Sequence, residues 1–149
     1  MPNPVTETPP APPAEAAAHF ARKLAFETDC DDVATALRGA AATALRGRDP
    51  GFVLLDVRGP AAFARGHVPG ALSLPRREIT AARMTAWSAG TLFVVYCAGP
   101  HCNGADKAAA ALAALGRPVK LMIGGMTGWR DEGLPVAEGA GPGAGNAPE

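Results

Sequence analysis

Two apolar runs, at residues 52–57 ("FVLLDV") and 91–96 ("TLFVVY"), most constrain the fold of this chain. Both are apolar along most of their length, which is typical of parallel strands that are covered by helices on both faces. A helix-forming stretch follows each run, at 59–66 and at 103–116. Strands that alternate with helices predict an α/β domain with a parallel sheet and right-handed crossovers. In such sheets, ligands bind beyond the carboxyl ends of the strands.

The 149-residue length suits one folded domain flanked by two tails that cannot add to its core. Residues 1–14 are rich in proline, and residues 139–149 are nearly all glycine, proline and alanine, so we expect two disordered tails. The folded domain should span residues 15–138 and open with a helix at about 15–25. A second helix should start at Asp29 as N-cap and end at Gly39 or Gly47, and another should run through 77–87.

The charge balance and the cysteine count exclude several classes of partner. Fourteen basic and fourteen acidic residues are interspersed, so nothing favours binding to nucleic acid or to an anionic membrane. No window approaches the roughly 18 apolar residues that span a bilayer, and no secretory signal pattern opens the chain. Three cysteines, an odd number, make no disulfide framework. We therefore expect free thiols in a reducing cytoplasm, and the composition fits a bacterial source.

The segment after the second apolar run places Cys97 at a strand end, where a loop of small residues leads into an Ala-rich helix. Backbone N–H groups of such a loop, together with the helix N-terminus, can converge on a sulfur or an anion. This setting predicts a lowered pKa for Cys97 and a cradle for a thiolate, a persulfide or an oxyanion. The expected loop residues are Ala98, Gly99, Pro100, His101, Cys102, Asn103 and Gly104, with His101 as a further donor.

Three segments, at 52–75, 94–116 and 119–136, together resemble the single-domain rhodaneses, a family of sulfurtransferases. The resemblance implies a rhodanese-like three-layer sandwich: a five-stranded, mostly parallel sheet with helices on both faces. It also implies that Cys97 is the nucleophile. Cys97 would take a sulfane sulfur from a donor as a persulfide and pass it to a thiophilic acceptor, which is covalent catalysis.

Four further residues match family motifs and are interpreted as supporting residues. Asp56 and Arg58 lie in "DVR", where they are expected to form hydrogen bonds near the catalytic edge of the sheet. His67 lies in "GHVPGA", and its expected role is to satisfy buried backbone groups rather than to transfer protons. Trp129 follows the glycine pair at 124–125 and is expected in the core or the pocket wall.

The loop departs from the family pattern at Cys102, where the common single-domain form has an arginine or a comparable donor. No arginine or lysine follows until Lys107, and the segment from Cys97 to Gly116 counts about two residues longer than usual. Losing the arginine removes a bidentate clamp for anions. The sequence therefore favours a thiol persulfide, of small-molecule or protein origin, over thiosulfate as the donor, with a thiol as acceptor.

Cys102 leaves a second function open, a dithiol redox enzyme of the reductase type. It could form a disulfide with Cys97, resolve a Cys97 persulfide or protect Cys97 from over-oxidation; a small loop side chain without such a role is an equal alternative. Related phosphatases need an arginine that is absent here, and Cys97, His101 and Cys102 lack the paired spacing of zinc motifs. A non-catalytic rhodanese-like binding module is the third alternative. We expect no metal, no cofactor, and a monomer or weak homodimer.

Overall fold

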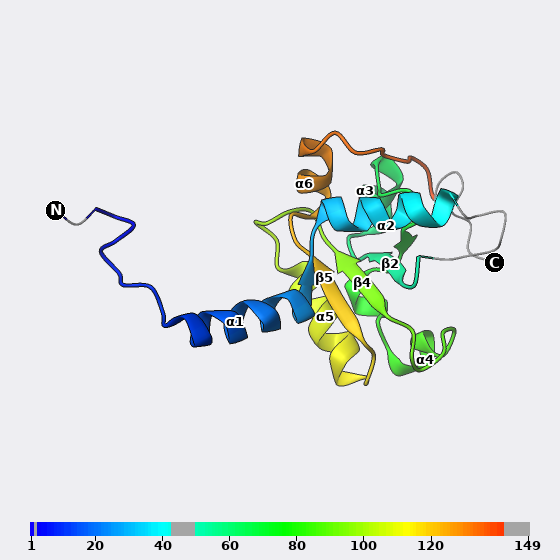
Figure 1. The fold of residues 1–149 in the computed structure, drawn as a ribbon. Coiled ribbons are helices and arrows are strands. Elements are labelled where there is room, and N and C mark those ends of the chain that lie inside the picture. The colour runs from blue at the N-terminus through cyan, green and yellow to red at the C-terminus, as the bar shows by residue number, and fades with distance from the viewer. Residues whose placement is uncertain (2, 43–49, 142–149) are drawn as a thin grey trace.

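The computed structural model describes residues 1, 3–42 and 50–141 as one α/β domain with a projecting N-terminal helix (Figure 1). Its sheet has five strands in the order β1-β5-β4-β2-β3, and all four pairings are parallel. The strands are β1 (Glu27–Thr28), β2 (Val53–Asp56), β3 (Leu72–Ser73), β4 (Phe93–Tyr96) and β5 (Val119–Met122). The helices are α1 (Pro13–Phe26), α2 (Cys30–Ala42), α3 (Pro60–Arg65), the 3₁₀ turn η2 (Arg76–Glu78), α4 (Ala81–Met84), α5 (Gly104–Ala114) and α6 (Gly125–Asp131). The predicted five-stranded α/β fold is confirmed.

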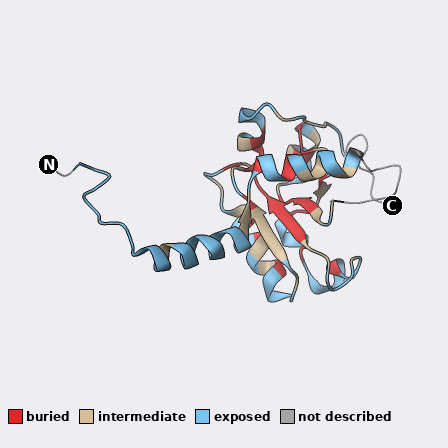
Figure 2. Ribbon diagram, viewed as in Figure 1, coloured by how far each residue is buried: buried red, intermediate tan, exposed pale blue. Residues whose placement is uncertain are grey.

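Helices cover both faces of the sheet and make two hydrophobic cores (Figures 1 and 2). One core packs α2, α3 and α6 against the sheet, and the other packs α4 and α5 against the opposite face. Successive residues of β4 alternate between them: Val94 and Tyr96 join the first core, whereas Phe93 and Val95 join the second. All four are buried, as expected of a central strand (Figure 2). Burying a side chain of this size stabilises the fold by about 1.5–3 kcal/mol.

The edge strand β1 was not predicted from the sequence. Its two residues, Glu27 and Thr28, pair with Leu121 and Met122 at the edge of the sheet. A two-residue strand has no room for an apolar pattern. At the far side of the domain, one isolated antiparallel bridge joins His67 to Ala137.

The helix boundaries correct two expectations. The carboxylate of Asp29 accepts a hydrogen bond from the Asp32 N–H at 2.8 Å, which confirms the N-cap. However, α2 continues through Gly39, so the predicted end at Gly39 is wrong, and Gly47 lies outside the described residues. The helix expected at 77–87 is divided into η2 and α4, because Ile79 adopts an extended conformation and Thr80 caps the N–H of Arg83 at 3.2 Å.

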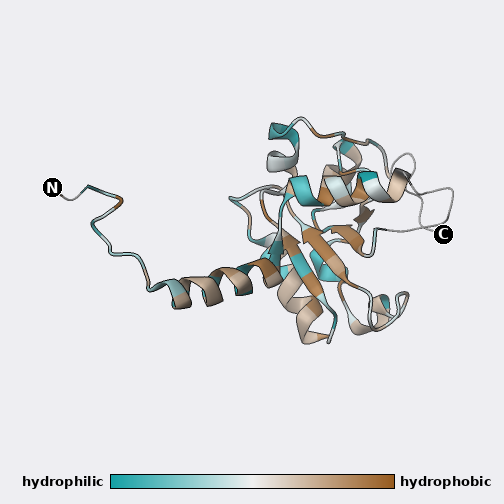
Figure 3. Ribbon diagram, in the orientation of Figure 1, coloured by the Kyte–Doolittle hydropathy of each residue, from teal (hydrophilic) through white to brown (hydrophobic). Residues whose placement is uncertain are grey.

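The first helix, α1, extends away from the sheet and has no buried residue (Figure 1). It starts with proline at its first position, where the missing N–H costs no hydrogen bond. Figure 3 shows apolar and polar residues mixed along it. The predicted disorder of the two tails stays a prediction, and residues 142–149 lie outside the described part. Within the described residues, no helix combines the length and the apolar character needed to cross a membrane.

Candidate active site at the end of strand β4

Cys97 directly follows β4 and faces the side of the sheet that α5 covers. Its side chain packs in the same core as Val95, and the residue is only 8 % exposed. Two backbone hydrogen bonds fix it from below: Met126 N–H donates to the Cys97 carbonyl at 3.0 Å, and Thr127 N–H donates to the Ala98 carbonyl at 2.8 Å. The Thr127 hydroxyl donates to the same Ala98 carbonyl at 3.0 Å. The first turn of α6 therefore holds the start of the cysteine loop.

Gly125 makes this close approach of α6 to the loop feasible. Its φ is +59°, and a Cβ atom there would lie 2.6 Å from the Cys97 carbonyl oxygen and 2.7 Å from the Gly99 nitrogen. These are backbone atoms, which cannot move aside as a flexible side chain can. A glycine is therefore required at position 125 for steric and conformational reasons.

The loop bends back so that Cys102 returns to Cys97. The Cys102 N–H donates to the Gly99 carbonyl at 3.1 Å, and the two sulfur atoms lie 2.7 Å apart. The Gly104 N–H, at the start of α5, donates to the Cys102 sulfur at 3.4 Å. A Cβ atom at Gly104 would lie 2.8 Å from the Cys97 sulfur, so this glycine leaves room for the thiol pair. Cys97 and Cys102, the two cysteines for which the sequence predicted sulfur chemistry, therefore lie together in one site.

The two thiols have pKa values displaced in opposite directions. Burial raises the pKa of Cys97, and the hydrogen bond with Cys102 raises it further. The pKa of Cys102 is lowered, first by that same hydrogen bond and then by the Gly104 N–H. Of the two thiols, Cys102 is therefore the one that ionises more readily. The expectation of a lowered pKa for Cys97 is wrong, because burial and the hydrogen bond with Cys102 outweigh the Ala98 backbone contact that stabilises its charge.

Beneath the site, a buried carboxylate joins β2 to β4. Asp56 is fully buried and accepts from Arg58, whose Nε lies 3.0 Å from Oδ1 and whose Nη2 lies 2.6 Å from Oδ2. The hydroxyl of Tyr96, the residue before Cys97, donates to Oδ2 at 2.8 Å. Arg58 also donates to the Gly66 carbonyl at 2.7 Å. These bonds connect the ends of neighbouring strands, and neither Asp56 nor Arg58 lines the pocket beside the thiols.

Trp129 belongs to the core on the opposite face of the sheet from Cys97, and His67 lies beside Phe63 of that same core. His67 is fully buried, its Nδ1 lies 2.8 Å from the Phe63 carbonyl, and its ring stacks on Phe63. Trp129 is 1 % exposed and donates from Nε1 to the Pro135 carbonyl at 2.7 Å. Neither lines the pocket beside the thiols.

The remaining loop residues divide into inner and outer positions. Gly99 is buried, and Ala98 is half-buried beneath the loop. Pro100, His101 and Asn103 are exposed. The His101 ring folds back over Gly99, where a Cβ would come within 3.0 Å of it, rather than over the thiols. Asn103 occupies the N-cap position of α5 without a side-chain cap bond. Nothing in this geometry marks an insertion, so the longer loop stays a prediction.

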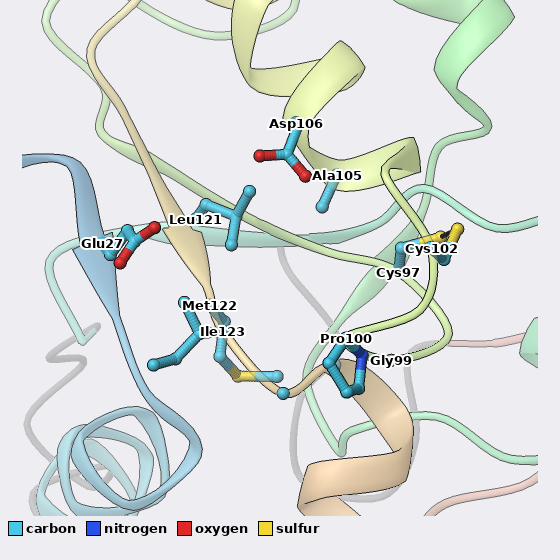
Figure 4. A pocket seen from close by; sticks show the side chains of 12 residues that line it. Glu27, Cys97, Gly99, Pro100, Cys102, Ala105, Asp106, Leu121, Met122 and Ile123 are labelled. Atoms are coloured by element: carbon cyan, nitrogen blue, oxygen red, sulfur yellow. Dashed lines mark hydrogen bonds between the residues drawn. The ribbon is translucent and has the colours of Figure 1, made fainter. Parts of the chain in front are cut away.

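A cavity of about 220 Å³ opens beside the two thiols (Figure 4). Figure 4 shows Cys97 and Cys102 at one end, next to the start of α5, and Glu27 of β1 at the other. Asp106 on α5 and Leu121 on β5 line the space between them. A second hollow on the loop includes Cys102 and His101 but not Cys97. Glu27, Asp106 and Leu121 were not predicted from the sequence. Among them, only Asp106 had a local signal, its position in the first turn of α5.

Among the described residues, no group of three or more histidines, cysteines and carboxylates is placed to hold a metal ion. What the site does offer is a buried strand-end thiol, a second thiol within hydrogen-bond distance and an adjoining cavity. A family model described as the rhodanese-like domain matches residues 40–132. The chain belongs to the rhodanese-like domain family. Its fold agrees with the three-layer arrangement that the family resemblance implied.

Known relatives extend this assignment. The BH2092 protein from Bacillus halodurans is 37 % identical, with a TM-score of 0.73 over 85 % of this rhodanese-like chain and 87 % of that one. A thiosulfate sulfurtransferase from Pseudomonas aeruginosa has a TM-score of 0.60 over 80 % of this chain and 21 % of its own; at 23 % identity this likeness shows the fold alone.

A curated relative, the HTH-type transcriptional regulator Rv0324 of Mycobacterium tuberculosis, is 41 % identical over 103 residues. These residues make up 68 % of this chain and 45 % of that protein. This chain therefore spans less than half the length of the curated relative that it matches.

Proposed function

We propose that the protein is a sulfurtransferase that carries a sulfane sulfur as a persulfide on Cys97. The observation that carries the proposal is the position of Cys97: it ends the central strand of a rhodanese-like fold and lines a cavity large enough for a small donor. A persulfide at this position would extend the side chain from the thiol into that cavity. Membership in the rhodanese-like family supports the same chemistry.

The transfer proceeds by two displacements at sulfur. The Cys97 sulfur attacks the outer sulfur of a donor R–S–SH, a new S–S bond forms on Cys97, and the donor's S–S bond breaks to release R–S⁻. Because Cys97 has a raised pKa, its proton must leave as it attacks. The Cys102 sulfur, 2.7 Å away, is placed to accept that proton and to pass it to the departing thiolate. An acceptor thiol then takes the outer sulfur from Cys97.

The lining of the cavity favours a persulfide donor over thiosulfate. Two carboxylates, Glu27 and Asp106, border it, and none of its lining residues is lysine or arginine. Glu27 is paired with Lys23, whereas Asp106, in the first turn of α5, adds a negative charge that repels the thiosulfate dianion. Cysteine persulfide carries less negative charge than thiosulfate, so this carboxylate repels it less. Free thiols of this kind suit a reducing compartment, and we place the reaction in the bacterial cytoplasm.

The name of the Mycobacterium tuberculosis relative as a transcriptional regulator describes a protein of which this chain covers 45 %. The net charge of zero gives no support for nucleic-acid binding by this chain itself. The proposal therefore rests on the sulfur site alone.

The test is steady-state sulfur transfer to dithiothreitol from cysteine persulfide and from thiosulfate. Wild type should use both through Cys97, with kcat/KM about tenfold or more higher for the persulfide. Cys97→Ser should abolish enzymatic transfer from either donor. Cys30→Ser is the matched control and should keep full activity, because Cys30 is buried against the carbonyls of Ile123 and Gly125, outside the cavity lining. Transfer that persists in Cys97→Ser would overturn the proposal.

A further inference from the structure

The two sulfur atoms of the loop lie closer than packing alone would place them. Non-bonded heavy atoms prefer separations of roughly 3.5–4.0 Å, whereas the sulfurs of Cys97 and Cys102 lie 2.7 Å apart. A disulfide bond needs about 2.05 Å. A small rotation of the two side chains would therefore bring them to bonding distance.

Local backbone structure holds the sulfurs in this pair. The bond from Cys102 N–H to the Gly99 carbonyl turns the loop back, and the Gly104 N–H fixes the Cys102 sulfur from the other side. Gly104 has no side chain to separate the two thiols. The pair is therefore a product of the loop's own hydrogen bonds.

The two thiols differ in access, which gives them different roles. Cys97 is almost completely buried and lines only the inner cavity, whereas Cys102 is half-buried and lines both hollows. The third cysteine, Cys30, lies elsewhere, with its sulfur 3.6 Å from the Ile123 carbonyl oxygen. A sulfur atom bound to Cys97 thus has one thiol beside it, and that thiol is Cys102.

We propose that Cys102 resolves the Cys97 persulfide, so that the protein releases hydrosulfide and closes a Cys97–Cys102 disulfide. This inference rests on the proposed function, since it needs the persulfide to form on Cys97. It adds a second activity to the site, the thiol-dependent reduction of persulfides. The proposal assigns a chemical role to Cys102, which occupies the position where single-domain rhodaneses commonly have an arginine.

The chemistry balances without any group beyond the donor and a reducing thiol. The Cys102 thiolate attacks the inner sulfur of Cys97, the bond from that sulfur to the outer sulfur breaks, and the outer sulfur leaves with the electron pair as hydrosulfide. The sulfane sulfur is reduced by two electrons, and the two cysteine sulfurs are oxidised by one electron each. Two equivalents of a low-molecular-weight thiol then reduce the disulfide and become a disulfide themselves. The sum converts R–S–SH and two thiols into R–SH, hydrogen sulfide and one disulfide.

A single-turnover experiment tests this step on the full chain. Fully reduced protein, freed of reductant and kept without oxygen, is mixed with one equivalent of cysteine persulfide. Released hydrosulfide is trapped with monobromobimane, and the protein is weighed intact and mapped by peptides. Wild type should release about one hydrosulfide per chain and lose the mass of two hydrogens, with a disulfide between Cys97 and Cys102.

Cys102→Ser distinguishes the two proposals. It should keep the added sulfur on Cys97 and release less than about a tenth of the wild-type hydrosulfide, because no neighbouring thiol can attack. If Cys102→Ser retains the sulfur on Cys97 and wild type retains it equally, resolution is overturned and sulfur transfer stands. If neither protein ever binds sulfur at Cys97, the proposed function itself is overturned.

Two further measurements serve as controls. Cys30→Ser should behave as wild type, which shows that the effect is specific to the loop. Should Cys102→Ser fail to fold, wild type alone decides: in oxidised and reduced glutathione mixtures, the proposal expects a Cys97–Cys102 disulfide that forms and reopens reversibly. Wild type that shows only glutathione adducts, without this disulfide, would overturn the resolving role.

Discussion

The thiols of Cys97 and Cys102 share one hydrogen bond of 2.7 Å, and this bond moves their pKa values in opposite directions. Burial raises the pKa of Cys97, and the hydrogen bond between the two sulfurs lowers the pKa of Cys102. Cys102 is thus the more exposed thiol and the one that ionises more readily, whereas Cys97 is the buried thiol at the end of the strand. The division of roles in the site follows from this one contact.

Removing the donor should therefore raise the pKa of Cys102. In Cys97→Ala, the largest contribution that lowers this pKa is lost, so the value should move up toward the ordinary thiol value of about 8.5. The pH dependence of iodoacetamide alkylation at Cys102, followed by peptide mapping, measures this. Wild-type Cys102 should react at lower pH than the variant. Cys30 is the internal reference, since burial raises its pKa to about 11 and it should stay unmodified at neutral pH. An unchanged or lower midpoint in Cys97→Ala would contradict the assignment.

The support of the loop by α6 predicts a strong effect of Gly125→Ala. The added Cβ would lie 2.6 Å from the Cys97 carbonyl oxygen, a backbone atom that cannot move aside. Alanine would also be strained at the φ of +59° that Gly125 adopts. The expected loss is about 2–4 kcal/mol in the free energy of unfolding in urea, together with slower persulfide loading. Gly90→Ala is the matched control: a Cβ there meets nothing within 4 Å, and the change should stay within about 0.5 kcal/mol. Equal stabilities for the two variants would refute the role of Gly125.

The buried carboxylate below the site should be important for stability. Asp56→Asn keeps the shape of the side chain but removes the charge that faces Arg58, and it weakens the acceptor of the Tyr96 hydroxyl. Because the Arg58 side chain is only 14 % exposed, its charge would be left poorly compensated. We expect a loss of about 3 kcal/mol in urea unfolding. The exposed Lys23–Glu27 pair on the protein surface gives the comparison, and Lys23→Ala should cost less than about 1 kcal/mol. A loss below about 1 kcal/mol for both variants would show that the hydrogen bonds of Asp56 contribute little to stability.

The carboxylates of the cavity predict how donor preference can be changed. Asp106→Asn removes one negative charge from the lining, so kcat/KM for thiosulfate should rise by about twofold to tenfold. The value for cysteine persulfide, which carries less negative charge than thiosulfate, should change less. Asp131→Asn, at the far end of α6, serves as the control because it changes the same net charge outside the cavity. The effect should also shrink at high salt. An equal change for both donors would point to positioning rather than charge.

Much of this architecture was predictable, because long apolar patterns determine it. The fully apolar run at β4, the glycine-rich loop and the Ala-rich α5 indicated a parallel sheet and a strand-end site at Cys97. The expected N-cap Asp29 was likewise confirmed, since a short side chain followed by a helix has one local solution. Features that depend on contacts between residues distant in the sequence were harder to predict. β1 has only two residues. The break before α4 did have a local signal, the N-cap Thr80, which the expected helix at 77–87 ignored.

The electrostatics of the site could not be inferred from the loop sequence. The loop pattern predicted a lowered pKa at Cys97 because it counted amides and a helix N-terminus. It could not show that Cys97 is buried or that Cys102 turns back to within hydrogen-bond distance. Glu27 was missed for the same reason, because it comes from the edge strand and only the folded sheet brings it to the cavity. Charges contributed by distant elements are visible only in three dimensions.

The central claim, that Cys97 carries the transferred sulfur, is tested most directly by locating that sulfur. Cys102→Ser is treated with cysteine persulfide, the excess donor is removed, and the protein is alkylated, digested and mapped by mass spectrometry. The account predicts one added sulfur on the peptide that contains Cys97, and its loss when an acceptor thiol is added. A Cys97 peptide without added sulfur, in protein shown to be folded, would contradict it.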